Sequence, residues 1–173
     1  VPSNGADAAR MLRECVRLAR EEQRVVVFLE PIALYPMRDL HAEKDGLWMT
    51  RYPDPSEIIP LGEVGVSGDG TDLAIVTFGN GVYLSQHALP GIKNAGINAR
   101  IVDTRWLSPL PKAALTKAVE GCKRILIVDE TRHSGGVAEA LMAHFHEAAP
   151  GAKLARITAE DSFIATGPAY AVT

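Results

Sequence analysis

The chain reads Leu73-Ala74-Ile75-Val76-Thr77-Phe78-Gly79 near its middle, an apolar and β-branched run that stops at a glycine. Such a run is typical of a strand that is buried on both faces of a parallel sheet. Residues Val82–Ala95 follow it with helical spacing, although Pro90 should kink or shorten that helix. A buried strand that leads into a helix is one unit of an α/β fold.

The same alternation continues on both sides of this unit. Glu63–Ser67 is a further predicted strand, and Gly68-Asp69-Gly70 predicts a hairpin that joins it to Leu73–Phe78. We therefore predict a three-layer α/β sandwich with a mostly parallel sheet and one antiparallel edge strand. The downstream elements are the strands Arg100–Asp103, Ile125–Asp129 and Leu154–Ile157 and the helices Lys112–Glu120 and Val137–Ala148.

The first third of the chain forms a separate pattern. Apolar residues recur at helical spacing from Met11 to Ala19, and Val25–Leu29 then predicts a strand buried on both faces. From Pro31 to Pro60 prolines and aromatic residues alternate, which predicts an extended connector that its aromatic side chains pin to a surface. We place a domain boundary there, with residues 1–56 before it and 57–173 after it.

Composition limits the class of protein. Apolar residues make up 47%, charged residues 23%, and the net charge is −3, which argues against nucleic acid or an anionic membrane as a partner. Cys15 and Cys122 match no metal spacing, so we expect reduced, packed thiols in a cytoplasmic protein. The chain begins at Val1 without a methionine or a signal peptide, and we expect it to be a piece of a longer polypeptide.

One motif superficially matches a dinucleotide fingerprint. Gly79-Asn80-Gly81 opens a helix, and Asp103 follows at the end of the next strand. Leu84 stands at the third glycine position, however, and Arg105 and Trp106 crowd the place of a ribose. A tight turn without a ligand is the favoured interpretation.

A polar segment from Asp129 to Gly136 lies between a strand and a helix, at the carboxyl edge of the sheet. Ser134 is placed to cap the helix that follows. His133 is adjacent to Ser134, and adjacent residues do not face each other as nucleophile and base. We expect Arg132, His133 and Ser134 to serve a partner contact or assembly.

The histidines predict no metal site. His144 and His146 are two residues apart on a helix and do not share a face. His41 lies in a charged, solvated loop, and His87 has no partner that the sequence identifies.

Several stretches together resemble the C-terminal half of the beta subunit of thiamine-diphosphate-dependent pyruvate and branched-chain 2-oxoacid dehydrogenases. Their order and spacing span nearly the whole chain. They are Pro2-Ser3, Val27–Pro31 with Leu34-Tyr35, Gly70–Gly79, Val102–Leu110, Ile127–Glu130, Gly135–Glu139 and the segment from Asp161 to Tyr170.

The resemblance implies that residues 1–56 are the end of a pyrimidine-binding domain with its linker, and that residues 57–173 are a transketolase C-terminal domain. The residues of that family that activate the cofactor lie upstream of Val1, so no catalytic, cofactor-binding or metal-binding residue is expected here. Glu30-Pro31 stands where transketolase-type sugar enzymes have a phosphate-binding arginine, which favours a plain 2-oxoacid. The stretch Arg17 to Arg24 looks longer than its counterpart in the branched-chain enzymes, where a loop helps to bind a potassium ion, so the resemblance does not carry a potassium site over to this chain. The insert-like stretch Met37 to Pro53 is unusual for a separate beta subunit, so a single-chain enzyme with both subunits fused stays an alternative.

The function that this resemblance implies is oxidative decarboxylation of a 2-oxoacid, with acyl transfer to a lipoyl group on a partner acyltransferase. Thiamine diphosphate with magnesium is expected in the full enzyme. That enzyme is expected to be a homodimer or a heterotetramer with an alpha-type part. This segment alone is expected to be inactive and to bind no cofactor. Glu30, Tyr35 and Arg38 are expected to close the substrate entrance. The alternatives are a piece of a transketolase-like sugar enzyme, a non-catalytic interaction module, and a nucleotide-binding module that uses Gly79, Gly81 and Asp103.

Overall fold

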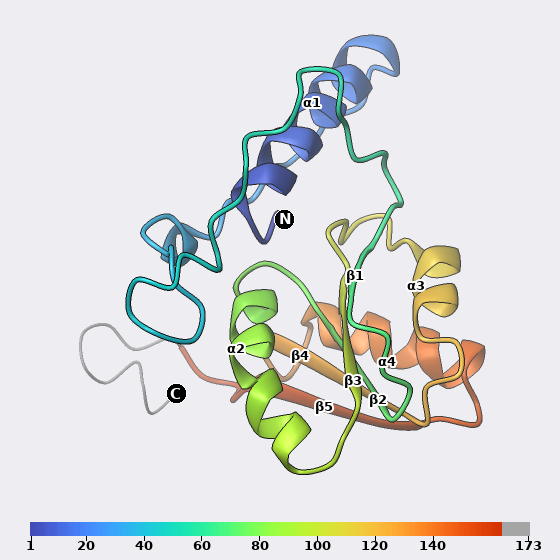
Figure 1. The fold of residues 1–173 in the computed structure, drawn as a ribbon. Helices are drawn as coiled ribbons and strands as arrows, with labels where there is room; N and C mark the ends of the chain where they lie inside the picture. The colour runs from blue at the N-terminus through green and yellow to red at the C-terminus, as the bar shows by residue number, and fades with distance from the viewer. Residues whose placement is uncertain (164–173) are drawn as a thin grey trace.

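The structure, a computed structural model, describes residues 1–163 and consists of one five-stranded sheet, four α-helices and a short 3₁₀ turn (Figure 1). The part of the 161–170 motif beyond residue 163 lies outside the described residues. The elements are α1 (Gly5–Glu21), the 3₁₀ turn η1 (Ile32–Leu34), β1 (Gly65–Ser67), β2 (Leu73–Thr77), α2 (Asn80–Asn94), β3 (Ala99–Asp103), α3 (Lys112–Ala118), β4 (Arg124–Arg132), α4 (Val137–Ala148) and β5 (Lys153–Ala159).

The strands follow the order β1-β3-β2-β4-β5, and β1 alone is antiparallel to its neighbour. This arrangement confirms the predicted fold class. The predicted hairpin is wrong, because β1 pairs with β3, with Gly65 opposite Asp103, and β3 separates it from β2. Gly70 passes so close to the start of β3 that an added Cβ would lie 2.4 Å from the Asn98 carbonyl. The glycines of Gly68-Asp69-Gly70 therefore let the chain pass close to the β3 backbone and do not form a hairpin turn.

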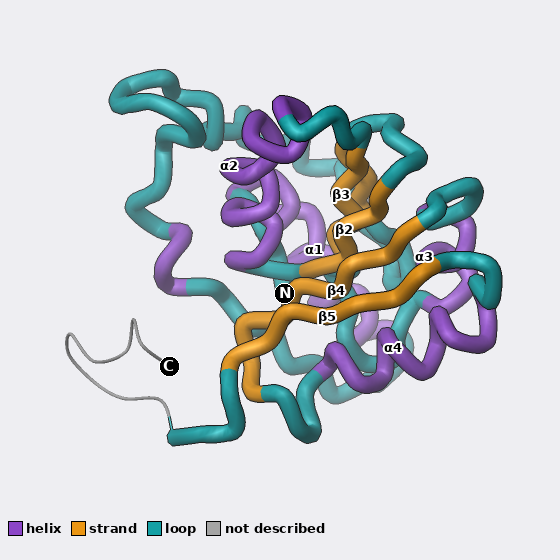
Figure 2. Tube along the Cα trace, turned by 90° about the horizontal axis from the view of Figure 1, so that it is seen from below, coloured by secondary structure: helices purple, strands orange, loops and turns teal. Residues whose placement is uncertain are grey.

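Helices cover both faces of the sheet (Figure 2). Successive residues of β2 alternate between the faces: Ala74 and Val76 join the cluster under α3 and α4, and Ile75 joins the cluster under α2. The helix α2 continues past Pro90 to Asn94, so the expected shortening is wrong. Leu89 and Ile92, on the two sides of the proline, pack against the sheet residues Ile75 and Ile101.

The helix α1 forms as predicted, but Val25–Leu29 does not form a strand. Val26 and Phe28 pack against the cluster of α1, whereas Val25, Val27 and Leu29 are 96%, 77% and 55% exposed. The reason is that no strand within residues 1–163 lies beside this segment to supply its hydrogen bonds. In the same range, no helix has both the length and the apolarity to cross a bilayer.

Candidate functional site

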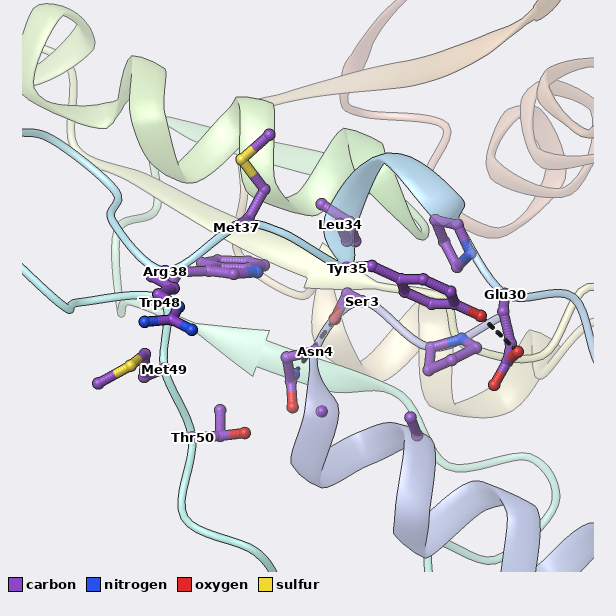
Figure 3. Close-up of a pocket in the computed structure, with 14 residues that line it drawn as sticks. Ser3, Asn4, Glu30, Leu34, Tyr35, Met37, Arg38, Trp48, Met49 and Thr50 are labelled. Atoms are coloured by element: carbon purple, nitrogen blue, oxygen red, sulfur yellow. Dashed lines mark hydrogen bonds between the residues drawn. The ribbon is translucent and has the colours of Figure 1, made fainter. Parts of the chain in front are cut away.

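A cavity of about 390 Å³ lies where the start of α1 meets the connector (Figure 3). The cavity fits the size range of small-molecule sites. Its wall comes from the residues before and within the first turn of α1, from the turn around η1, and from residues 48–50. The labelled lining residues are Ser3, Asn4, Glu30, Leu34, Tyr35, Met37, Arg38, Trp48, Met49 and Thr50.

The structure brings the three residues predicted for the substrate entrance, Glu30, Tyr35 and Arg38, to this one cavity. The turn η1 folds the chain so that the Tyr35 hydroxyl donates to the Glu30 carboxylate over 2.6 Å. This hydrogen bond raises the pKa of Tyr35, so the phenol stays a neutral donor. Glu30 and Arg38 are the charged residues of the lining, and Arg38 supplies its positive charge.

Trp48 gives the cavity a rigid apolar wall. Its ring meets that of Tyr83 on α2 edge to face, with 5.0 Å between the centroids and 81° between the planes. The Tyr83 hydroxyl donates to the Asp39 carbonyl over 3.1 Å, which ties the connector to α2 a second time. The prediction that an aromatic side chain pins the connector is correct for Trp48, whereas Tyr35 and Tyr52 are mostly exposed.

The charged loop between Arg38 and Trp48 is ordered by two carboxylates. Asp45 accepts four backbone N–H groups and Asp39 accepts two more. Desolvation would raise the pKa of the Asp45 carboxyl, but the backbone donors hold it well below its ordinary value. His41 and His87, for which the sequence identified no partner, stack on each other at 6.0 Å, and the His87 ring bonds the Leu40 carbonyl.

Gly81 and Asp103, which the sequence placed in a dinucleotide-like pattern, both make close contacts within the fold. A Cβ at Gly81 would lie 2.0 Å from the Thr77 hydroxyl, so this glycine allows the close packing of α2 on β2. The Asp103 carboxylate is buried and accepts hydrogen bonds from the Ser3 hydroxyl and the Arg105 backbone. It therefore joins the start of the chain to the end of β3.

The segment predicted for a partner contact, Arg132 to Ser134, is exposed at the carboxyl edge of the sheet. Ser134 does not cap α4, because its hydroxyl and its backbone N–H both donate to Asp161. Asp129 binds the start of α4 instead, and accepts the Ala138 N–H over 2.8 Å. The sequence does carry a signal for this contact, because Asp129 is an acidic residue at the end of a predicted strand and precedes a predicted helix.

Metal-ligating side chains do not converge in the part of the chain that the structure describes: no three of its histidines, cysteines and acids could hold one ion. Both cysteines are free and buried, and His144 is buried beside the Thr116 hydroxyl.

A family model for the transketolase C-terminal domain matches residues 62–173, which include the whole sheet and its helices. The chain belongs to the transketolase C-terminal domain family. An inactive β4 tetramer of a split-gene transketolase has the same fold, with a TM-score of 0.57 and 23% identity over 66% of this chain and 38% of that chain.

Relatives of this transketolase-family chain confirm the resemblance to dehydrogenase beta subunits. The Bacillus subtilis pyruvate dehydrogenase E1 component subunit beta is 32% identical over 149 residues, which are 86% of this chain and 42% of the relative. The Cupriavidus necator acetoin:2,6-dichlorophenolindophenol oxidoreductase subunit beta is 31% identical over 90% of this chain and 42% of its own length. The 1-deoxy-D-xylulose-5-phosphate synthase of Halothermothrix orenii is 30% identical over 64% of this chain and 18% of that relative. The chain thus spans less than half the length of these relatives.

Proposed function

We propose that this chain is the C-terminal part of a thiamine-diphosphate-dependent 2-oxoacid dehydrogenase component. The full enzyme would decarboxylate a 2-oxoacid oxidatively and pass the acyl group to the lipoyl group of a partner acyltransferase. The support is the similarity to subunits named for pyruvate and 2-oxoisovalerate dehydrogenases over most of this chain. Thiamine diphosphate, with magnesium, would be held by another part of the enzyme, since this chain spans less than half the length of these relatives.

The observation that carries a role for this segment is the cavity that joins Glu30, Tyr35 and Arg38. We assign it to the substrate entrance. The Arg38 guanidinium would bind the carboxylate of the arriving 2-oxoacid through charge-assisted hydrogen bonds. The Glu30 carboxylate, held by Tyr35, would repel a doubly charged phosphate, which disfavours a sugar phosphate.

We further propose that residues 1–56 are the end of a preceding domain with its linker. The exposure of Val25, Val27 and Leu29 supports this, because a continuous sheet would cover them. The enzyme would be a cytoplasmic homodimer or a heterotetramer with an alpha-type part. The exposed Arg132, His133 and Ser134 would contact a partner.

The entrance role is tested in the full enzyme by Arg38→Gln, with Arg51→Gln as the control at an exposed position outside the cavity lining. Loss of a charge-assisted hydrogen bond of about 1.5–3 kcal/mol should raise KM for the 2-oxoacid on the order of tenfold or more. Thiamine diphosphate affinity should stay unchanged in both variants. Equal KM values for the two variants would show that Arg38 does not bind the substrate.

The competing nucleotide interpretation is tested on the chain itself by isothermal titration. We expect neither thiamine diphosphate nor NAD to bind. Tight NAD binding to the wild-type chain would favour a nucleotide-binding module and would contradict the proposal.

A further inference from the structure

A buried polar contact joins the start of α1 to the end of β3. Asp103, the last residue of β3, is 5% exposed, and its carboxylate accepts the Ser3 hydroxyl over 2.5 Å and the Arg105 N–H over 3.0 Å. Ser3 lies just before α1 and is also buried. The contact therefore connects two segments that are a hundred residues apart in the sequence.

Arg105 makes a second connection beside the first. Its guanidinium donates from Nε and Nη2 to the carboxylate of Asp7, in the first turn of α1, over 2.9 and 2.8 Å. The backbone of Arg105 has a φ of 56°, a conformation that residues other than glycine rarely adopt. The hydrogen bonds from the Arg105 backbone to Asp103 and from its guanidinium to Asp7 thus hold this residue in a strained conformation, and the junction depends on them.

Two buried carboxylates lie at this junction. Asp7 and Asp103 are 4% and 5% exposed, and the Arg105 side chain beside them is 13% exposed. Burial, with a smaller contribution from the Asp7 carboxylate, raises the pKa of Asp103 to about 6, against the opposing effects of the Ser3 hydrogen bond and of Arg105. The other charged groups nearby are Glu63 at 3.5 Å from Arg105, Arg10 at 3.6 Å from Asp7, and the Val1 amino group on the Arg105 carbonyl.

We propose that Asp103 is a proton-operated latch, which holds the first turn of α1 on the sheet when it is protonated and loosens that contact when it ionises. The ionised form places a charge on a group that is only 5% exposed and that feels the Asp7 carboxylate, whereas the neutral form needs only the Ser3 and Arg105 partners that the structure shows. Ser3 and Asn4 also line the cavity, so the latch would stiffen or relax one cavity wall near neutral pH.

The sign of the pH effect follows from the direction of the shift. An acid whose pKa is raised in the closed junction favours closure fully below its ordinary value, and this contribution disappears as the pH rises through about 6. For an ordinary value of 3.8, closure at pH 5 should be favoured about tenfold more than at pH 8.

The test is amide hydrogen exchange by NMR on the intact chain between pH 5 and pH 8, corrected for intrinsic rates. Protection of the amides of Ala6, Asp7 and Ala8 should fall about tenfold over this range, relative to amides of β2 and β4. Asp103→Asn should remove the dependence, because an amide accepts the Arg105 N–H and donates to Ser3 without a charge. Asp72→Asn, at the opposite end of the sheet beside Lys123, should keep it.

A flat wild-type profile, or the same slope in Asp103→Asn, would overturn the latch. If Asp103→Asn does not fold, the carboxyl ¹³C signal of Asp103 in the wild type decides the question. The proposal is supported if the Asp103 signal titrates with a midpoint near 6 and the exchange of the first-turn amides of α1 changes with the same midpoint. A midpoint near 4, or amides whose exchange does not change with pH, would contradict it.

Discussion

Gly81 shows how closely α2 approaches β2, since an added Cβ would overlap the buried Thr77 hydroxyl. Gly81→Ala should lower the free energy of unfolding by about 1–3 kcal/mol, the usual cost of overpacking. Urea denaturation followed by circular dichroism measures it. Gly91→Ala in the same helix is the control, because its Cβ would meet no atom within 4 Å, and it should be neutral or stabilise by up to about 1 kcal/mol. Similar losses for both variants would contradict this account.

Asp129 is the residue that fastens α4 to the sheet. Its two oxygens accept the Thr131 and Ala138 N–H groups, and it is buried. Asp129→Ala should cost about 1–3 kcal/mol, because two donors lose their partner. The neighbouring Glu130→Ala, which removes an exposed contact with Asn80, should change the same unfolding transition by less than about 0.5 kcal/mol. A destabilisation by Glu130→Ala as large as that by Asp129→Ala would argue against the cap.

At the scale of elements, the connector owes its position to Trp48 and not to regular structure. Trp48→Ala should lower the free energy of unfolding by about 2 kcal/mol, since the side chain is partly buried against α2. It should also speed amide exchange in residues 39–48. Leu47→Ala, at an adjacent and 61% exposed side chain, should leave both measurements nearly unchanged. If Trp48→Ala is neutral, the connector is held by other contacts, such as those with Tyr83 and His87 of α2 and with Arg13 of α1.

At the scale of the whole molecule, the chain exposes an apolar surface along residues 25–32. Such a surface promotes association in solution. We expect the wild type to sediment as oligomers at high concentration and Val25→Ser/Val27→Ser to sediment closer to a monomer, with an unchanged urea midpoint. Val26→Ser/Phe28→Ser is the matched control, because these side chains pack against α1 and their loss should lower the midpoint. Equal sedimentation of wild type and Val25→Ser/Val27→Ser would rule out this surface as the cause.

The sequence by itself determined the helices and parallel strands of residues 73–159, the antiparallel edge strand, and the family. These features depend on local periodicity and on motifs of adjacent residues, which a single chain displays directly. Glu30, Tyr35 and Arg38, which line one cavity, were also near enough in sequence for a short turn to bring them together.

The contacts between distant residues are visible only in the folded chain. The fold pairs β1 with β3 instead of β2, bonds Asp129 of β4 to the start of α4, and joins Ser3 to Asp103. It also left Val25–Leu29 without strand partners. Each of these outcomes depends on contacts across long loops, whose energy comes from burial and hydrogen bonds in the assembled fold and leaves no periodic trace in the sequence.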